Sequence, residues 1–210
     1  MIPVPRLCYW TDGARGRGGR EQLELIERLA RGGVEAIVLR ERDWSTGEWR
    51  ACAERLAPLR AGGLGVLASR RLDLCRALGL DGVHLGAEAV PVADARAFLG
   101  PDALIGYSAH GADEARAAAK AGASYVSLSP VYATGSKPGT EPRGAAWLAA
   151  SVAGLTVPAL ALGGVTPERI PELRAAGAWG VVAIAALGAA PDPEAAAREF
   201  RRALADEKAR

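Results

Sequence analysis

Short apolar segments alternate with longer segments of helical periodicity along almost the whole chain, and this alternation constrains the fold more than any other feature. The apolar segments recur at intervals of about 20 to 30 residues, and each has the length of a buried strand. Stretches rich in alanine, leucine, arginine and glutamate follow them. We predict strands at residues 7–11, 36–40, 64–68, 82–85, 104–108, 125–128, 159–162 and 181–184.

The segments between the strands carry helix signals, with capping residues or proline near the start and glycine near the end. Eight strand–helix units in 210 residues favour an α/β fold of the (β/α)8 TIM-barrel class, and a doubly wound open sheet is the weaker alternative. No linker or composition break divides the chain, so we expect one domain over residues 1–210. The clearest predicted helices cover residues 20–31, 46–59, 113–121, 167–176 and 193–204.

Composition excludes several classes of protein. Half of the residues are hydrophobic and the net charge is +2, from 26 basic and 24 acidic residues that are scattered along the chain. We therefore expect no nucleic-acid or membrane partner. No segment approaches the ~20 apolar residues of a membrane span, and the start lacks a secretory signal, so we expect a cytoplasmic protein. Cys8, Cys52 and Cys75 are predicted to be reduced, buried thiols.

Two turns of small residues are candidates for a phosphate site. In a (β/α)8 barrel the reacting groups lie at the carboxyl ends of the strands, and phosphate is commonly held after the seventh and eighth. Gly163 and Gly164 follow the seventh predicted strand, and a turn that begins with Ala185 and Ala186 follows the eighth. Both turns can present backbone N–H groups to one anion. Glycine at a strand end is also common where no ligand binds, so that alternative stays open.

The longest loop, residues 129–144, follows the sixth predicted strand. Thr134, Ser136 and Lys137 place two hydroxyl groups and an ammonium group within four positions, which suits the binding of phosphate or diphosphate oxygens. A solvated polar loop is the alternative.

Arg40 closes the second predicted strand. Side chains alternate along a strand, so Arg40 shares a face with Val38 and is predicted to point into the barrel mouth if Ile37 packs against helices. An arginine there needs an anionic partner, which is either a ligand or a carboxylate such as Asp12 or Glu41.

The two histidines have different predicted roles. His84 lies within an apolar strand and is predicted to be a hydrogen-bonded core residue. His110 follows the fifth strand on the face where reacting groups gather, so it is the better candidate for a general acid or base, with helix capping as the structural alternative. The two histidines lie too far apart in the sequence to form a zinc motif.

The ordered set of strand-end motifs resembles the superfamily of thiamine phosphate synthase and thiazole tautomerase (TenI), over nearly the whole chain. The fold that this resemblance implies is again a (β/α)8 barrel. The matching stretches are Tyr9-Trp10-Thr11-Asp12, Leu39-Arg40-Glu41, Asp81-Gly82-Val83-His84-Leu85-Gly86, Ile105-Gly106-Tyr107-Ser108-Ala109-His110, residues 129–137 and Leu162-Gly163-Gly164-Val165.

The resemblance implies binding of a small phosphorylated thiazole. In the synthase, thiazole phosphate attacks the methylene carbon of an aminopyrimidine diphosphate, and pyrophosphate leaves with the help of Mg²⁺. The phosphate half of the site matches this pattern, and Ser108 is expected to contact substrate. The pyrimidine and metal half departs from it at Val38, Arg42, Ser69, Arg70, Ala87 and Ala89.

These departures remove both magnesium carboxylates of the family pattern. Glu88 is then a metal ligand, and Mg²⁺ a cofactor, only if the synthase activity holds; otherwise we expect no cofactor. The departures favour a metal-independent, TenI-like tautomerase in which Arg40, Arg42 or Arg70 meets a substrate carboxylate. Pro130 stands where that branch has its catalytic histidine, which leaves His110 and Glu41 as candidates for proton transfer. The synthase and a non-catalytic phosphate-ligand binder are the alternatives, and the sequence does not decide whether the chain forms a homo-oligomer.

Overall fold

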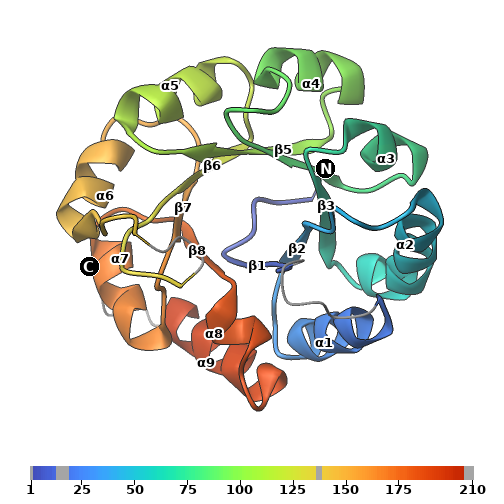
Figure 1. Cartoon of the computed structure of the whole chain (residues 1–210). Helices are drawn as coiled ribbons and strands as arrows, with labels where there is room; N and C mark the ends of the chain where they lie inside the picture. The colour runs from blue at the N-terminus through green and yellow to red at the C-terminus, as the bar shows by residue number, and fades with distance from the viewer. Residues whose placement is uncertain (1, 13–18, 136–138, 206–210) are drawn as a thin grey trace.

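The computed structural model describes residues 2–12, 19–135 and 139–205, and it contains eight strands that alternate with helices (Figure 1). The strands are β1 (Leu7–Trp10), β2 (Ala36–Leu39), β3 (Gly65–Ser69), β4 (Gly82–Leu85), β5 (Leu104–Ala109), β6 (Tyr125–Leu128), β7 (Ala159–Leu162) and β8 (Gly180–Ala183). The helices are α1 (Gly19–Arg31), α2 (Thr46–Ala61), α3 (Leu72–Ala77), α4 (Val92–Leu99), α5 (Ala112–Lys120), α6 (Gly144–Val152), the 3₁₀ turn η2 (Pro167–Arg169), α7 (Ile170–Ala175), α8 (Ala185–Gly188) and α9 (Pro193–Ala205).

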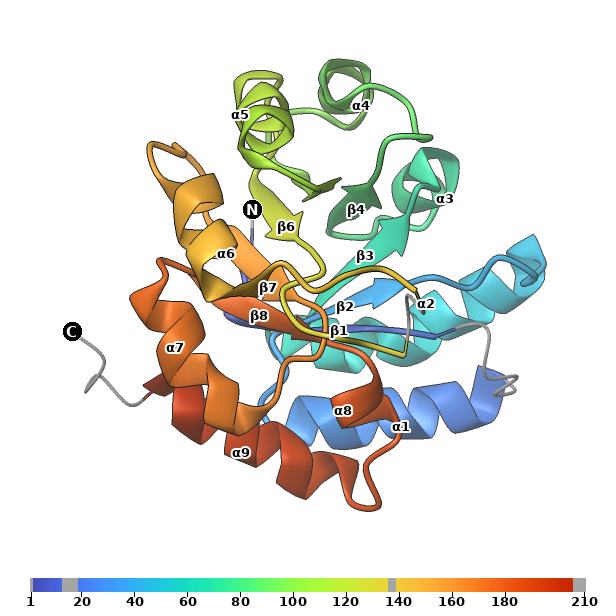
Figure 2. The ribbon, with the colours of Figure 1, turned by 60° about the vertical axis from the view of Figure 1, so that its left-hand side comes forward.

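The strands form a closed parallel barrel in chain order, and β8 pairs with β1 to complete the ring. The predicted (β/α)8 barrel is therefore confirmed, and the alternative of an open sheet is wrong. The helices surround the barrel, with α1 and α9 side by side (Figures 1 and 2). Two surface ion pairs, Arg28 with Asp192 and Arg31 with Glu194, join the α1 helix to the segment at the start of α9.

The predicted element bounds agree with the structure to within two residues, apart from one helix. The segment at 167–176 is divided, because it opens as the 3₁₀ turn η2 and continues as α7. Pro171 has no N–H group to donate to the carbonyl of Pro167, so a continuous α-helix would lose a hydrogen bond there. In the described part of the chain, none of the helices combines the length and apolar character that crossing a membrane requires.

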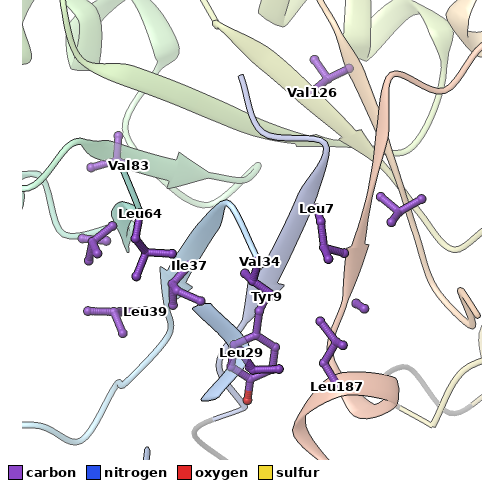
Figure 3. Close-up of a cluster of buried hydrophobic side chains, with 14 of the residues drawn as sticks. Leu7, Tyr9, Leu29, Val34, Ile37, Leu39, Leu64, Val83, Val126 and Leu187 are labelled. Carbon is purple, nitrogen blue, oxygen red and sulfur yellow. The ribbon is translucent and has the colours of Figure 1, made fainter. Parts of the chain in front are cut away.

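Two hydrophobic layers follow from the alternation of side chains along each strand. Ile37 and Leu39 point outward and pack under the helices, together with residues such as Leu29 and Leu64 (Figure 3). Val38, between them, points into the barrel and packs with an inner cluster. That cluster contains Cys8, Trp10, Ala36, Val38, Leu67, Leu104, Tyr125, Leu160, Val182 and Ile184.

The prediction of reduced, buried thiols is confirmed, since all three cysteines are free and buried. Burial is the largest cause that raises the pKa of each thiol, to about 12 for Cys52 and about 11 for Cys75. These thiols are therefore protonated at neutral pH and are poor nucleophiles.

Gly82 shows how closely the strands approach inside the barrel. It pairs with Leu104 of β5, and a Cβ atom at residue 82 would lie 2.8 Å from the backbone nitrogen of Leu104. Real Cβ atoms do not come this close to backbone, so a side chain there would push β4 and β5 apart.

We predict that Gly82→Ala lowers the free energy of unfolding by about 3 kcal/mol, because the added methyl group meets backbone that cannot move aside. Gly47→Ala is the matched control, since Gly47 lies in α2 with only the Ser45 hydroxyl oxygen near its added methyl group. Alanine in a helix should raise stability by about 0.5 to 1 kcal/mol. Urea unfolding of both variants checks this, and equal stability of the two would contradict the packing described for β4.

Candidate active site

A cavity of about 650 Å³ opens at the carboxyl ends of the strands. All eight strands, or the loops that follow them, contribute to its wall. The lining residues are Trp10, Val38, Arg40, Arg42, Ser69, Arg70, His84, Leu85, Gly86, Ala87, Glu88, Ser108, His110, Ser129, Pro130, Ala133, Thr134, Gly135, Leu162, Gly163, Gly164, Val165, Thr166, Arg169, Val182, Ala183, Ile184, Ala185 and Ala186. Most of the predicted site residues are therefore brought together in one place.

Arginines line the β2 and β3 side of the cavity. Arg40 follows β2, where its backbone N–H donates to the Thr11 hydroxyl oxygen at 2.8 Å and its guanidinium lies 5.8 Å from the centre of the Trp10 ring. Burial is the largest cause that lowers the pKa of Arg40, and the nearby Asp12 opposes this. Arg42 lies at the exposed rim, two residues further on. Arg40 thus reaches the cavity as the strand alternation predicts.

Arg70 follows β3 in an unusual backbone conformation. Its φ angle is 63°, in the left-handed region that non-glycine residues rarely adopt. Its N–H donates to the carbonyl of His84 at 3.0 Å, which ties this turn to the end of β4. Its guanidinium Nη2 lies 3.0 Å from Oε2 of Glu88. This ion pair stands on the side of the cavity where the family resemblance expects carboxylates and a metal.

The residues of this side do not fit a magnesium site. Mg²⁺ is bound by carboxylate and other oxygen ligands. Among the described residues, Glu88 is the only carboxylate that lines the cavity, and it is paired with Arg70. Within the same part of the chain, no three histidine, cysteine, aspartate or glutamate side chains gather in a way that could hold a metal ion.

The opposite side of the cavity is built from small residues. Gly163 and Gly164 have φ angles of 102° and 61°, and a Cβ atom at Gly163 would lie 2.9 Å from Cα of Pro130. Backbone hydrogen bonds hold the turn against the β6 loop, from Val131 N–H to Leu162 and from Tyr132 N–H to Gly163. Only glycine fits this close approach without strain.

The other predicted phosphate contacts are divided between described and undescribed residues. Thr134 lines the cavity on the β6 loop, and Ala185 and Ala186 line it at the start of the short helix α8. Ser136 and Lys137 lie outside the described residues, so their predicted contacts stay predictions.

A neutral histidine forms part of the cavity floor. His84 Nδ1 lies 3.0 Å from the Tyr125 hydroxyl and Nε2 lies 2.9 Å from the Ser108 hydroxyl, so the prediction of a hydrogen-bonded core histidine is confirmed. Burial is the main cause that lowers the pKa of His84 to about 3, and the charge of Arg40 adds to it. Trp10 packs against His84 with ring centres 4.3 Å apart.

The two candidates for proton transfer lie in different places. His110 is exposed at the rim of the cavity, with Nδ1 at 3.5 Å from Oε2 of Glu114. Glu41 is buried and is not among the residues that line the cavity, and burial is the largest cause that raises its pKa. The structure therefore places Glu41 off the cavity wall, and its role in proton transfer stays a prediction. Glu41 lies just after the end of β2, where its carboxylate interacts with the Thr11 hydroxyl and lies near Cys52 of α2.

Sequence reasoning did not identify Arg169 or Trp10 as site residues. Arg169 Nη1 donates to the carbonyl of Gly164, and its guanidinium lies 4.3 Å from the centre of the Tyr132 ring. It belongs to η2, and no periodic signal in the sequence shows that its side chain turns back over the glycine turn. Trp10 ends an apolar strand, where an inward tryptophan is indistinguishable from ordinary core.

Comparison with known proteins agrees with this geometry. Residues 8–187 match the family described as thiamine monophosphate synthase. A thiamine-phosphate synthase of Salinispora arenicola is 48% identical, with 97% of this chain and 99% of the relative covered. One from Roseiflexus castenholzii is 36% identical, with 94% and 89% covered. The structure is similar to that of thiamine phosphate pyrophosphorylase from Pyrococcus furiosus, with a TM-score of 0.85 and 27% identity over 97% of this chain and 96% of that one.

We predict that His84 stays neutral between about pH 5 and pH 9, because its pKa is about 3. The chain has two histidines, so His110→Gln leaves His84 as the only imidazole. Its ring proton resonances, followed by NMR, should not shift with pH over this range.

The same pKa has a consequence for stability. The unfolded chain takes up the proton at about pH 6.5, well above the pKa of His84 in the folded state. His84 should therefore lower the free energy of unfolding as the pH falls below about 6.5, by up to ~1.4 kcal/mol per pH unit. An NMR titration midpoint near 6.5 would contradict both expectations.

Proposed function

Because the chain belongs to the thiamine monophosphate synthase family, we propose that it is a thiamine-phosphate synthase. This enzyme is a transferase that joins a thiazole phosphate to an aminopyrimidine diphosphate and releases pyrophosphate. Relatives that carry this name cover nearly the whole chain. They favour the synthase over the TenI-like tautomerase that the missing carboxylates suggested. Pro130, in place of the catalytic histidine of the tautomerase pattern, supports the same choice.

The observation that carries the proposal is the arrangement of two anion-binding sides across one cavity. Arg40, Arg42 and Arg70 stand after β2 and β3, and the glycine turn and α8 stand after β7 and β8. In a closed barrel of eight strands β3 lies opposite β7, whereas β2 and β8 are separated only by β1, so Arg70 and the glycine turn stand on opposite sides of the cavity. A reaction between a phosphate ester and a diphosphate ester needs this arrangement.

The side chains of this site have separate tasks in the proposed reaction. The glycine turn, Thr134 and the first N–H groups of α8 hold the thiazole phosphate. The arginines hold the diphosphate. The aromatic and aliphatic floor of the cavity, with Trp10 and Val182, lies between the phosphate side and the arginine side. This geometry aims the thiazole nitrogen at the methylene carbon of the pyrimidine.

The chemical step forms a bond from nitrogen to carbon and breaks the bond from that carbon to the diphosphate oxygen. The electron pair leaves with pyrophosphate, and the arginines neutralise the negative charge that develops on it. No proton has to move in this step. His110 is therefore not required for the synthase reaction, whereas an isomerisation of a thiazole carboxylate phosphate moves a proton and needs such a group.

A tautomerase is the second candidate function. The observation that favours it is the pairing of Glu88 with Arg70, since a site with guanidinium groups and no free carboxylate suits a substrate that carries a carboxylate. His110, at the rim, would then be the group that transfers the proton.

We expect the purified protein to form thiamine phosphate and pyrophosphate from the two substrates. Arg40→Ala should lower kcat/KM by about 10- to 100-fold, because it removes a charged donor to the diphosphate. His110→Ala should stay within about threefold of the unchanged protein, since no proton transfer is needed. Arg71→Ala is the control, because Arg71 pairs with Asp73 and does not line the cavity. If the protein forms no thiamine phosphate but isomerises a thiazole carboxylate phosphate, and if His110→Ala abolishes that isomerisation, the protein is a tautomerase and the synthase proposal is wrong.

We also predict that Gly164→Ala raises the KM for thiazole phosphate by about tenfold or more, by distorting the turn that should hold the phosphate. A Cβ atom at residue 164 would lie 2.8 Å from Cβ of Tyr132. Gly144→Ala is a matched control, since Gly144 also has a positive φ angle, 79°, but has nothing within 4 Å of an added Cβ and does not line the cavity. Equal KM values for the two variants would place the phosphate elsewhere.

A further inference from the structure

We propose that the arginines on the β2 and β3 side bind a diphosphate group directly, without a divalent cation. The nature of the ligand rests on the proposed function, but the charge and position of the site do not. The site consists of Arg40, Arg42 and Arg70, together with Glu88 as an exposed partner of Arg70.

The charge of this side of the cavity favours an anion over a cation. Three guanidinium groups line it, and arginine stays protonated at any physiological pH. Glu88 is the only carboxylate in the described lining and neutralises one of the three, and Asp12, which does not line the cavity, lies near Arg40 and offsets part of its charge. A divalent cation placed here would meet a net positive charge and one oxygen ligand that is already engaged. A diphosphate would meet the donors that its oxygens require.

The backbone fixes two of these arginines in place. Arg40 N–H is bonded to the Thr11 hydroxyl, and the side chain is half-buried against Trp10. Arg70 N–H is bonded to the carbonyl of His84 at the end of β4. The left-handed backbone of Arg70 is an uncommon conformation that a purely solvated side chain does not need. The backbones of both residues are thus fixed at the cavity wall before any ligand binds.

The ion pair between Glu88 and Arg70 is weak. Its side chain is 83% exposed, against 41% for that of Arg70, and such ion pairs at the surface contribute little in water. A diphosphate oxygen can therefore displace the carboxylate from Arg70. Glu88 thus competes with the anion for Arg70, which is the opposite of the role of a metal ligand.

Calorimetric titration with inorganic pyrophosphate tests the proposal, once in EDTA and once in excess MgCl2. We expect binding in EDTA with a Kd within about threefold of that in Mg²⁺. Arg70→Gly should weaken binding by about tenfold or more, because it removes a charged donor. Glycine is chosen because it tolerates the left-handed backbone of this position, so the variant should fold. Arg71→Ala, on the neighbouring residue, is the matched control and should bind as the unchanged protein does.

Glu88→Gln separates the two roles of the carboxylate. If Glu88 competes with the anion, the variant should bind pyrophosphate about two- to fivefold more tightly in EDTA, in keeping with the small strength of an exposed ion pair. If Glu88 is a metal ligand, the variant should lose binding that the unchanged protein shows only with Mg²⁺. Thermal unfolding of each variant shows whether it is folded.

The outcomes distinguish this inference from the proposed function. Pyrophosphate binding that requires Mg²⁺ and is lost in Glu88→Gln overturns the metal-free site and leaves the synthase intact. Unchanged binding in Arg70→Gly overturns the site as well. Absence of pyrophosphate binding under both conditions, with no thiamine phosphate formed, overturns the synthase itself.

Discussion

The alternation of side chains between the inside and the outside of the barrel determines which residues can take part in chemistry. Val38 of β2 and Arg40, just after it, line the cavity, whereas Ile37 and Leu39 pack under the helices and Glu41 does not line the cavity. Closure of the barrel fixes this alternation, because each strand is paired on both sides, and a shift of one residue would turn the outward side chains of that strand into the cavity and its inward side chains toward the helices. The arginine therefore reaches the cavity, and the adjacent carboxylate cannot.

The same alternation builds the cavity floor in layers. Gly106 of β5 faces inward between His84 of β4 and Tyr125 of β6, and a Cβ atom at residue 106 would collide with both side chains. The missing side chain gives His84 the space to bond Tyr125, and Ser108, two residues along the same strand, bonds its other nitrogen. Both ring nitrogens are thereby engaged, and burial keeps the ring neutral. An uncharged floor next to Arg40 leaves the positive charge of the cavity to the arginines.

Much of the fold could be predicted from the sequence because strand length, apolar content and spacing are local properties. The positions of Arg40 and of the glycine turn follow from where the strands end and, for Arg40, from the alternation of side chains along β2. The prediction that Glu41 acts at the mouth rests on its nearness in sequence to Arg40, but nearness along the chain does not place a side chain on the cavity wall, and Glu41 is buried away from it. The contact of Arg70 with Glu88 joins two different loops, and that of Arg169 with Gly164 folds a turn back on itself, and no periodic pattern encodes either contact.

The turn after β3 shows how one residue can change the chemistry of a site without a change of fold. Its backbone carries residue 70 toward the β4 loop in a left-handed conformation, which aspartate and asparagine adopt more readily than arginine. A carboxylate in this place would attract a cation, which in turn would attract a diphosphate. A guanidinium supplies the positive charge itself, with donors fixed to a planar group rather than to an exchangeable ion. The cavity then still binds an anion. The strength of that binding depends on ionic strength rather than on the concentration of a metal ion, because exposed charges such as Arg42 and Arg70 are screened by salt.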